Sequence, residues 1–137
     1  MADRRATVTE SPFRLEGGLL LIDVELTGPF STDKLTLAVD TGTAVTTILP
    51  EVIDRLGYDI RTAGGRTTVT TAVSQEHGYW RHVDRIEALG ITVSDFPVHV
   101  FDLHERAGID GLLGLDFLLP LIVEFRFPEG LIRAHSG

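Results

Sequence analysis

The sequence contains no cysteine, so thiol catalysis, thiolate metal sites and a disulfide framework are all excluded. It also contains no asparagine, and Lys34 is the only lysine among twelve basic residues. This preference for arginine is typical of a GC-rich bacterial genome. No apolar run approaches the roughly 20 residues of a membrane-spanning helix, and the N-terminal segment lacks the apolar core of a secretory signal. We therefore expect a soluble, cytoplasmic protein with no membrane partner.

Positive charge is also scarce. The formal net charge is −8, and the twelve basic residues are scattered along the chain without a cluster. Phosphate backbones are bound by cationic surfaces, so we do not expect a nucleic acid partner. Apolar material is sufficient for a core, because 43% of the 137 residues are hydrophobic. We expect one domain over residues 1–137, with the polar residues 1–12 flexible.

Short runs with β-strand character dominate the sequence. Residues 19–27 form one such run, and residues 35–40 form a second in which alternate positions are apolar. Residues 66–88 predict a long hairpin, although the apolar residues of its second arm do not alternate strictly. Residues 50–57 predict a short helix, because proline suits its first turn and glycine suits its end.

The second half of the chain continues this pattern. Two short strands are expected at residues 91–93 and 96–101, and Pro97 favours an edge or irregular position. The expected elements that follow are one short helix and two strands, at residues 115–120, 121–127 and 131–135. Many short strands with one or two short helices predict a mainly β domain, either a small barrel or a sandwich.

The sequence Asp40-Thr41-Gly42-Thr43 follows directly on a predicted strand. A carboxylate at the junction of a strand and a loop is held on a rigid element and can still face a cleft. Gly42 allows a tight turn, and the threonine hydroxyls can bond to the carboxylate or the backbone. By itself the Asp-Thr-Gly triplet could be an ordinary turn, since chance produces it in roughly a few per cent of such chains.

A second motif strengthens the first, because residues 109–118 read IDGLLGLDFL. In this order, the two motifs resemble the retropepsin-like aspartic proteases, nearest to their single-domain bacterial and cellular members. The resemblance extends over residues 19–134. It implies a small closed β-barrel in which Leu112-Leu113-Gly114 packs across the loop that carries the aspartate.

The resemblance also implies roles for individual residues. Asp40 corresponds to the catalytic carboxylate, and Thr41, Gly42 and Thr43 correspond to its supporting loop. The hairpin at residues 66–88 corresponds to the flap. The flap tip would then lie near Ser74, Gln75, Glu76, His77 and Gly78. The terminal strands, at residues 121–127 and 131–135, are candidates for a dimer interface.

A single Asp-Thr-Gly in the chain implies that two chains are needed. Hydrolysis by water needs one group that takes a proton from the water and another that protonates the carbonyl oxygen. Two carboxylates about 3 Å apart share a proton and can divide these roles. Asp102, Asp110 and Asp116 are not followed by Thr-Gly, so the second loop must come from another subunit of a two-fold homodimer. Water is then the nucleophile, and no cofactor is expected.

Other residues give weaker signals. His99, Asp102 and His104 have the one spacing that could hold a metal, but no second cluster supports them, and we expect no metal site. Ser74 lacks the sequence setting of a catalytic serine. Asp116 is expected to be structural, at the start of a helix.

The leading hypothesis is a homodimeric aspartic endopeptidase that hydrolyses peptide bonds in an extended peptide or protein substrate. One alternative is a non-catalytic dimerisation or peptide-binding module with the same fold. Another is a monomer that becomes active only when a partner or a membrane brings two copies together. The intact Asp40-Thr41-Gly42 favours the enzyme, because a binding module has no need of a proton-sharing acid there.

Overall fold

The computed structural model describes residues 7–70, 75–103 and 108–137, and most of them lie in β-strands, as the sequence predicts. Six of the described strands close into a barrel in the order β3–β4–β9–β5–β8–β7, and β7 pairs back with β3. Their bounds are Leu19–Thr27 for β3, Thr32–Val39 for β4, Gly111–Leu113 for β9, Thr47–Ile48 for β5, Ile91–Val100 for β8 and Gln75–Ala88 for β7. The closed barrel that the family resemblance implies is therefore confirmed.

One apolar core fills the barrel. Alternate residues of the two neighbouring strands β3 and β4 point inward, as a period of two requires. Ile22, Val24, Leu35 and Leu37 are each at most 2% exposed. Burial of these side chains removes apolar surface from water, and this is the main source of stability in a chain without disulfides.

In the described residues two short α-helices complete the barrel, as the sequence predicts. Helix α1 (Pro50–Arg55) begins at a proline and buries Val52 against the core, and Gly57 after it has a φ of +96°. Helix α2 (Leu115–Leu118) follows β9. The 3-10 turns are η1 (Ile60–Thr62) and η2 (Phe127–Glu129). Within the described parts of the chain, no helix is long and apolar enough to cross a membrane.

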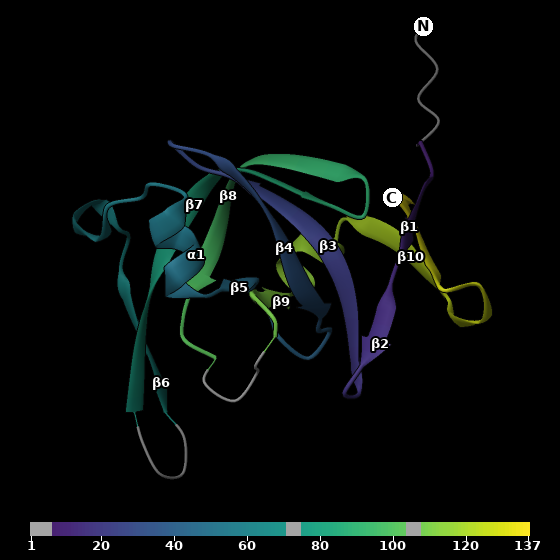
Figure 1. Cartoon of the computed structure of the whole chain (residues 1–137), viewed down its shortest axis with the longest axis horizontal. Coiled ribbons are helices and arrows are strands. Elements are labelled where there is room, and N and C mark those ends of the chain that lie inside the picture. Colours follow the sequence, from purple (N-terminus) through teal and green to yellow (C-terminus); the bar gives the residue numbers. More distant parts are fainter. Residues whose placement is uncertain (1–6, 71–74, 104–107) are drawn as a thin grey trace, which may run out of the picture.

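The predicted hairpin is present, because β6 (Arg66–Thr70) pairs antiparallel with the start of β7 and extends beyond the barrel (Figure 1). The irregular pattern of the second arm also has a structural cause. On β7 two exposed residues, instead of one, separate the buried Val83 from the buried Ile86, so the buried face of the strand changes there. Asp95 lies opposite this point on β8 and has a φ of +54°. Both strands change phase together, so their register is unbroken.

The prediction of two separate strands at residues 91–93 and 96–101 is wrong. Strand β8 is continuous from Ile91 to Val100 and includes Pro97. Pro97 pairs with His82 of β7, whereas β5 reaches β8 only at His99 and Val100. Among the described residues Pro97 therefore has a strand on one side only, and the missing amide hydrogen of proline costs no ladder bond there. The predicted edge position of Pro97 is confirmed.

A second sheet, in the order β1–β11–β10, lies at one side of the barrel, away from the β6–β7 hairpin (Figure 1). Its strands are β1 (Thr9–Pro12), β11 (Leu131–Ser136) and β10 (Leu121–Arg126), and β2 (Arg14–Glu16) joins the barrel beside β3. The flexibility expected for residues 1–12 stays a prediction; in the structure Thr9–Pro12 pair with β11, and the Thr9 hydroxyl donates to the Leu89 carbonyl at 2.5 Å. Residues 1–6 lie outside the described residues.

Candidate active site

Asp40 follows directly on β4, where the backbone still bonds to the barrel. Its amide donates to the Leu113 carbonyl at 2.9 Å, and its Oδ1 accepts from the Gly42 amide at 2.9 Å. The Asp40 side chain is partly exposed, and Thr41 and Gly42 beside it are exposed. The carboxylate is therefore oriented by its own loop and remains accessible from outside the barrel.

Strand β9 crosses the base of this loop. It runs parallel to β4, with Ala38 opposite Leu112 and Val39 opposite Leu113, and antiparallel to β5 on its other side. The next residue, Gly114, packs so closely against the loop that a Cβ there would lie 2.6 Å from the Val45 carbonyl carbon. The structure thus brings Leu112-Leu113-Gly114 across the Asp40 loop, as the resemblance implies.

The Asp116 carboxylate fixes the far end of the Asp40 loop. Its Oδ1 accepts from the Thr46 amide at 3.0 Å, from the Thr46 hydroxyl at 2.7 Å and from the Phe117 amide at 2.9 Å. The Thr46 hydroxyl in turn accepts from the Gly114 amide at 3.1 Å. These bonds agree with the expectation that Asp116 is structural, and they tie the Asp40 loop to the start of α2.

Sequence reasoning did not single out Thr46. The residue is fully buried, and its hydroxyl bonds with residues about 70 positions away. A signal was present, because residues 45–49 read VTTIL and a hydroxyl in such an apolar run needs a buried partner. The identity of that partner depends on how the barrel closes.

Replacing Asp116 with alanine is expected to lower the free energy of unfolding by about 3 kcal/mol, because the buried Thr46 donors lose their acceptor. Replacement with asparagine should cost only about 1 kcal/mol, because an oxygen at the Oδ1 position still reaches all three donors. Urea unfolding of both variants measures the difference. Equal losses for the two variants would mean that the negative charge, not the acceptor geometry, is the stabilising feature.

The residues assigned to the flap are described only in part. Ser74 lies outside the described residues, and residues 75–78 form the beginning of β7, where His77 pairs with Thr68 and Gly78 with Thr67. A hollow of about 630 Å³ lies between the hairpin and α1, and Tyr79 and Asp54 are among its lining residues. Burial raises the pKa of Tyr79. The Tyr79 phenol therefore remains a hydrogen-bond donor at neutral pH.

His99 lies on the barrel wall, where its amide donates to the Thr46 carbonyl at 2.8 Å. It is 9% exposed, and its ring lies 5.3 Å from that of Trp80 and 5.5 Å from that of Phe101. Burial lowers the pKa of His99 from its usual 6.5. The contribution of the neutral His99 ring to stability is therefore complete above pH 6.5. It is lost as the pH falls through the lower pKa that His99 has in the folded state.

Of the three residues whose spacing could suit a metal, His99, Asp102 and His104, the last lies outside the described residues. Where the structure describes the chain, no group of three or more His, Cys, Asp or Glu side chains could hold a metal ion.

The closed barrel, with an Asp-Thr-Gly loop crossed by an apolar strand, has the architecture of an aspartic protease subunit. The family model described as "gag-polyprotein putative aspartyl protease" matches residues 26–119, which include both motifs. The chain therefore belongs to this family of retropepsin-like aspartic proteases. No curated protein sequence matches it significantly.

Solved structures share the fold. A retropepsin-like aspartic protease from Rickettsia conorii is 20% identical, with a TM-score of 0.72 over 99% of this chain and 97% of that chain. The EIAV protease in complex with the inhibitor HBY-793 is 18% identical, with a TM-score of 0.53 over 74% of this chain and 86% of that chain. Basic 7S globulin from soybean is 13% identical, with a TM-score of 0.59 over 97% of this chain and 50% of that chain.

Proposed function

We propose that this chain is one half of a homodimeric aspartic endopeptidase in which two Asp40 carboxylates activate a water molecule. The observation that carries the proposal is the placement of Asp40. Its backbone is held by β9, one carboxylate oxygen is held by the Gly42 amide, and the side chain is partly exposed beside the exposed Thr41. A carboxylate enclosed in the barrel could not meet a second copy.

The need for two copies follows from the count of active-site loops. Asp40 is the only aspartate in the chain that Thr-Gly follows. A two-fold axis beside the loop brings the same loop of a second chain opposite the first. Two carboxylates at about 3 Å cannot both ionise without repulsion, so the pair holds one proton and offers one acid and one base.

The proposed reaction uses this shared proton. The ionised Asp40 takes a proton from water while the water oxygen bonds to the peptide carbonyl carbon, and the protonated Asp40 gives its proton to the carbonyl oxygen. The tetrahedral diol then returns one hydroxyl proton to the pair. The carbon–nitrogen bond breaks with its electron pair on nitrogen, which accepts a proton from the other carboxyl. The products are a carboxyl terminus and an amine, and the pair again holds one proton.

The substrate in this proposal is an extended peptide. The β6–β7 hairpin extends beyond the barrel, as a flap over a peptide would (Figure 1). An extended chain can add to exposed backbone groups as a further strand, with its side chains alternating between pockets.

One alternative is a binding module that retains the fold without hydrolysis. Incubation with a mixed peptide library in heavy-oxygen water, between acid and neutral pH, separates the two functions. We expect new peptide termini by mass spectrometry, with heavy oxygen in each new carboxyl group, because hydrolysis adds the oxygen of water to the carbonyl carbon. Peptides that are retained by the protein but stay intact at every pH would support the binding module.

A further inference from the structure

The hollow between the β6–β7 hairpin and α1 is separate from the Asp40 loop. Its volume is about 630 Å³, and none of the described residues that line it belongs to that loop. The hairpin contributes Arg66, His77 and Tyr79, and α1 contributes Asp54 to the opposite wall. A ligand in this hollow would therefore contact the hairpin outside the loop that carries the carboxylate.

Polar side chains from both strands of the hairpin lie on the same face. Arg66 lies directly opposite Tyr79 in the antiparallel pair, and Thr68 lies opposite His77. Alternate residues of a strand point to the same face, so these four side chains share one face of the hairpin. Directly opposite residues have Cβ atoms about 4.5–5.5 Å apart. The Arg66 guanidinium and the Tyr79 phenol can therefore donate to the same carboxylate.

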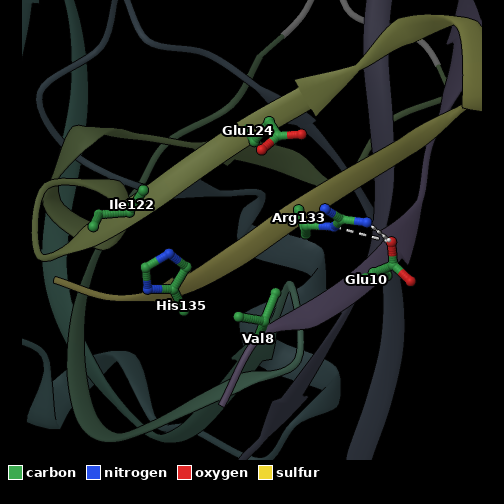
Figure 2. Close-up of a pocket in the computed structure, with 6 residues that line it drawn as sticks. All are labelled: Val8, Glu10, Ile122, Glu124, Arg133 and His135. Carbon is green, nitrogen blue, oxygen red and sulfur yellow. Dashed lines mark hydrogen bonds and ion pairs between the residues drawn. The ribbon is translucent and has the colours of Figure 1, made fainter. Parts of the chain in front are cut away.

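The charge of Arg66 is not matched by an acidic neighbour. Arg66 is exposed, and its guanidinium forms neither an ion pair nor a hydrogen bond with another described residue. Other arginines differ. On the sheet of β1, β11 and β10, Arg133 pairs with Glu10 at 3.1 Å (Figure 2). In the wall of the hollow, Arg61 pairs with Asp59 at 2.7 Å. In a chain with a net charge of −8, the unmatched Arg66 is a point that attracts an anionic group.

Strand β6 is also an edge strand. It pairs with β7 on one side and is the last strand in the order of the eight-stranded sheet, as far as the chain is described. On the free side of an edge strand, every second residue directs its N–H and C=O groups outward, where another extended chain can bond to them. The strand reads RTTVT and contains no proline. The edge beside Arg66 therefore offers the backbone groups that a further strand needs.

We propose that the β6 edge and the hollow bind an extended acidic segment of a protein substrate as an added strand. The inference rests on the proposed function, because it gives the substrates of that enzyme a second contact outside the Asp40 site. A glutamate of the segment lies opposite Arg66, and neighbouring strands are about 4.8 Å apart, a distance that its side chain can span. Backbone bonds supply affinity, and the contact with Arg66 and Tyr79 supplies the preference for acidic sequence.

The position of Asp54 gives the proposal a test by sign. Burial raises the pKa of Tyr79, and the negative charge of Asp54 raises it further, so Asp54 acts electrostatically on the hairpin wall. A carboxylate beside Tyr79 is attracted by Arg66 and repelled by Asp54. Removal of these two charges should therefore change the affinity in opposite directions. A purely structural role of the two residues predicts no such reversal.

The test measures binding of a fluorescent peptide of alternating threonine and glutamate by fluorescence anisotropy. The protein carries Asp40→Asn, so that the peptide stays intact. We expect Arg66→Gln to weaken binding about fivefold to tenfold, as for the loss of a partly exposed, charged hydrogen bond. Asp54→Asn should tighten binding about twofold to threefold. Arg14→Gln is the matched control. It removes the same charge from β2, where Arg14 pairs with Asp23, and should leave the affinity within about twofold.

Further probes separate the source of the carboxylate from the role of the backbone. Free glutarate and a peptide of alternating threonine and glutamine should each bind at least about fivefold more weakly than the acidic peptide. A backbone N-methylated acidic peptide should also lose affinity, because it cannot donate to an edge strand. With the active chain, a threonine–glutamate extension on a cleaved peptide should lower KM about fivefold at unchanged kcat, and Arg66→Gln should remove this advantage.

Several outcomes would overturn the inference. They are equal affinity of Arg66→Gln and its parent for the acidic peptide, absence of binding to the parent, and glutarate binding as tight as that of the peptide. An extension that leaves KM unchanged would likewise remove the contact with substrate. Binding is measured without hydrolysis, so the proposed function is judged separately. An active chain that fails to bind the acidic peptide would remove the added strand and leave the aspartic protease intact.

Discussion

Replacement of Asp40 with asparagine is expected to reduce peptide hydrolysis at least about a thousandfold, because neither general acid nor general base remains in the paired site. Folding should be almost unchanged. The Asp40 side chain is partly exposed, and an asparagine oxygen can accept the bond that the Gly42 amide donates to Asp40 Oδ1 at 2.9 Å. Turnover of a cleaved library peptide and urea unfolding measure the two properties.

Asp23→Asn is a matched control for this change. Asp23 lies on the exposed face of β3 and forms a surface ion pair with Arg14 at 3.3 Å. The control should retain wild-type turnover, because it makes the same chemical change away from the loop. Asp40→Asn with turnover comparable to that of Asp23→Asn would contradict the assignment of Asp40 as the catalytic acid and base.

Replacement of Gly111 with alanine is expected to lower the free energy of unfolding by about 3 kcal/mol or more. A Cβ at this position would lie 2.0 Å from the Thr47 carbonyl oxygen. That oxygen belongs to β5, which pairs with β9 inside the closed barrel. Neither strand can therefore move away from the new Cβ without disrupting its pairing with the neighbouring strands. The Asp40 loop bonds to β9, and the variant should lose activity together with stability.

Gly65→Ala is the control for this prediction. A Cβ at Gly65 meets nothing within 4 Å. It should change the unfolding free energy by less than about 0.5 kcal/mol, as surface substitutions usually do. Urea unfolding of the two variants and the wild type gives the comparison. Similar stability of Gly111→Ala and Gly65→Ala would show that β9 is not packed against β5 as the structure has it.

The parts of the fold that the sequence predicts are those with strong local signals. Strand β3 has the predicted bounds, and α1 begins at Pro50 as expected. The Asp40 loop and Leu112-Leu113-Gly114 were recognisable because each contains a glycine where a Cβ would come close to a neighbouring atom.

The features that the sequence did not reveal depend on contacts between distant segments. The shift of phase near Asp95 hides the alternation of β7, and β8 appears as two strands for the same reason. Strand β1 pairs with β11, more than 100 residues away, so its polar sequence gave no indication of pairing. The bond between Thr46 and Asp116 spans 70 residues and depends on the position of β9.

The central claim, that each active site needs one Asp40 from each of two chains, is tested most directly by mixing. Wild-type chain is incubated with an equal amount of Asp40→Asn chain until subunits have exchanged, and hydrolysis is measured per wild-type chain. Random pairing leaves about a quarter of the dimers with two intact loops, so this activity should fall to about half. Activity per wild-type chain that stays constant, however much of the variant is added, would show that a single chain carries a complete active site.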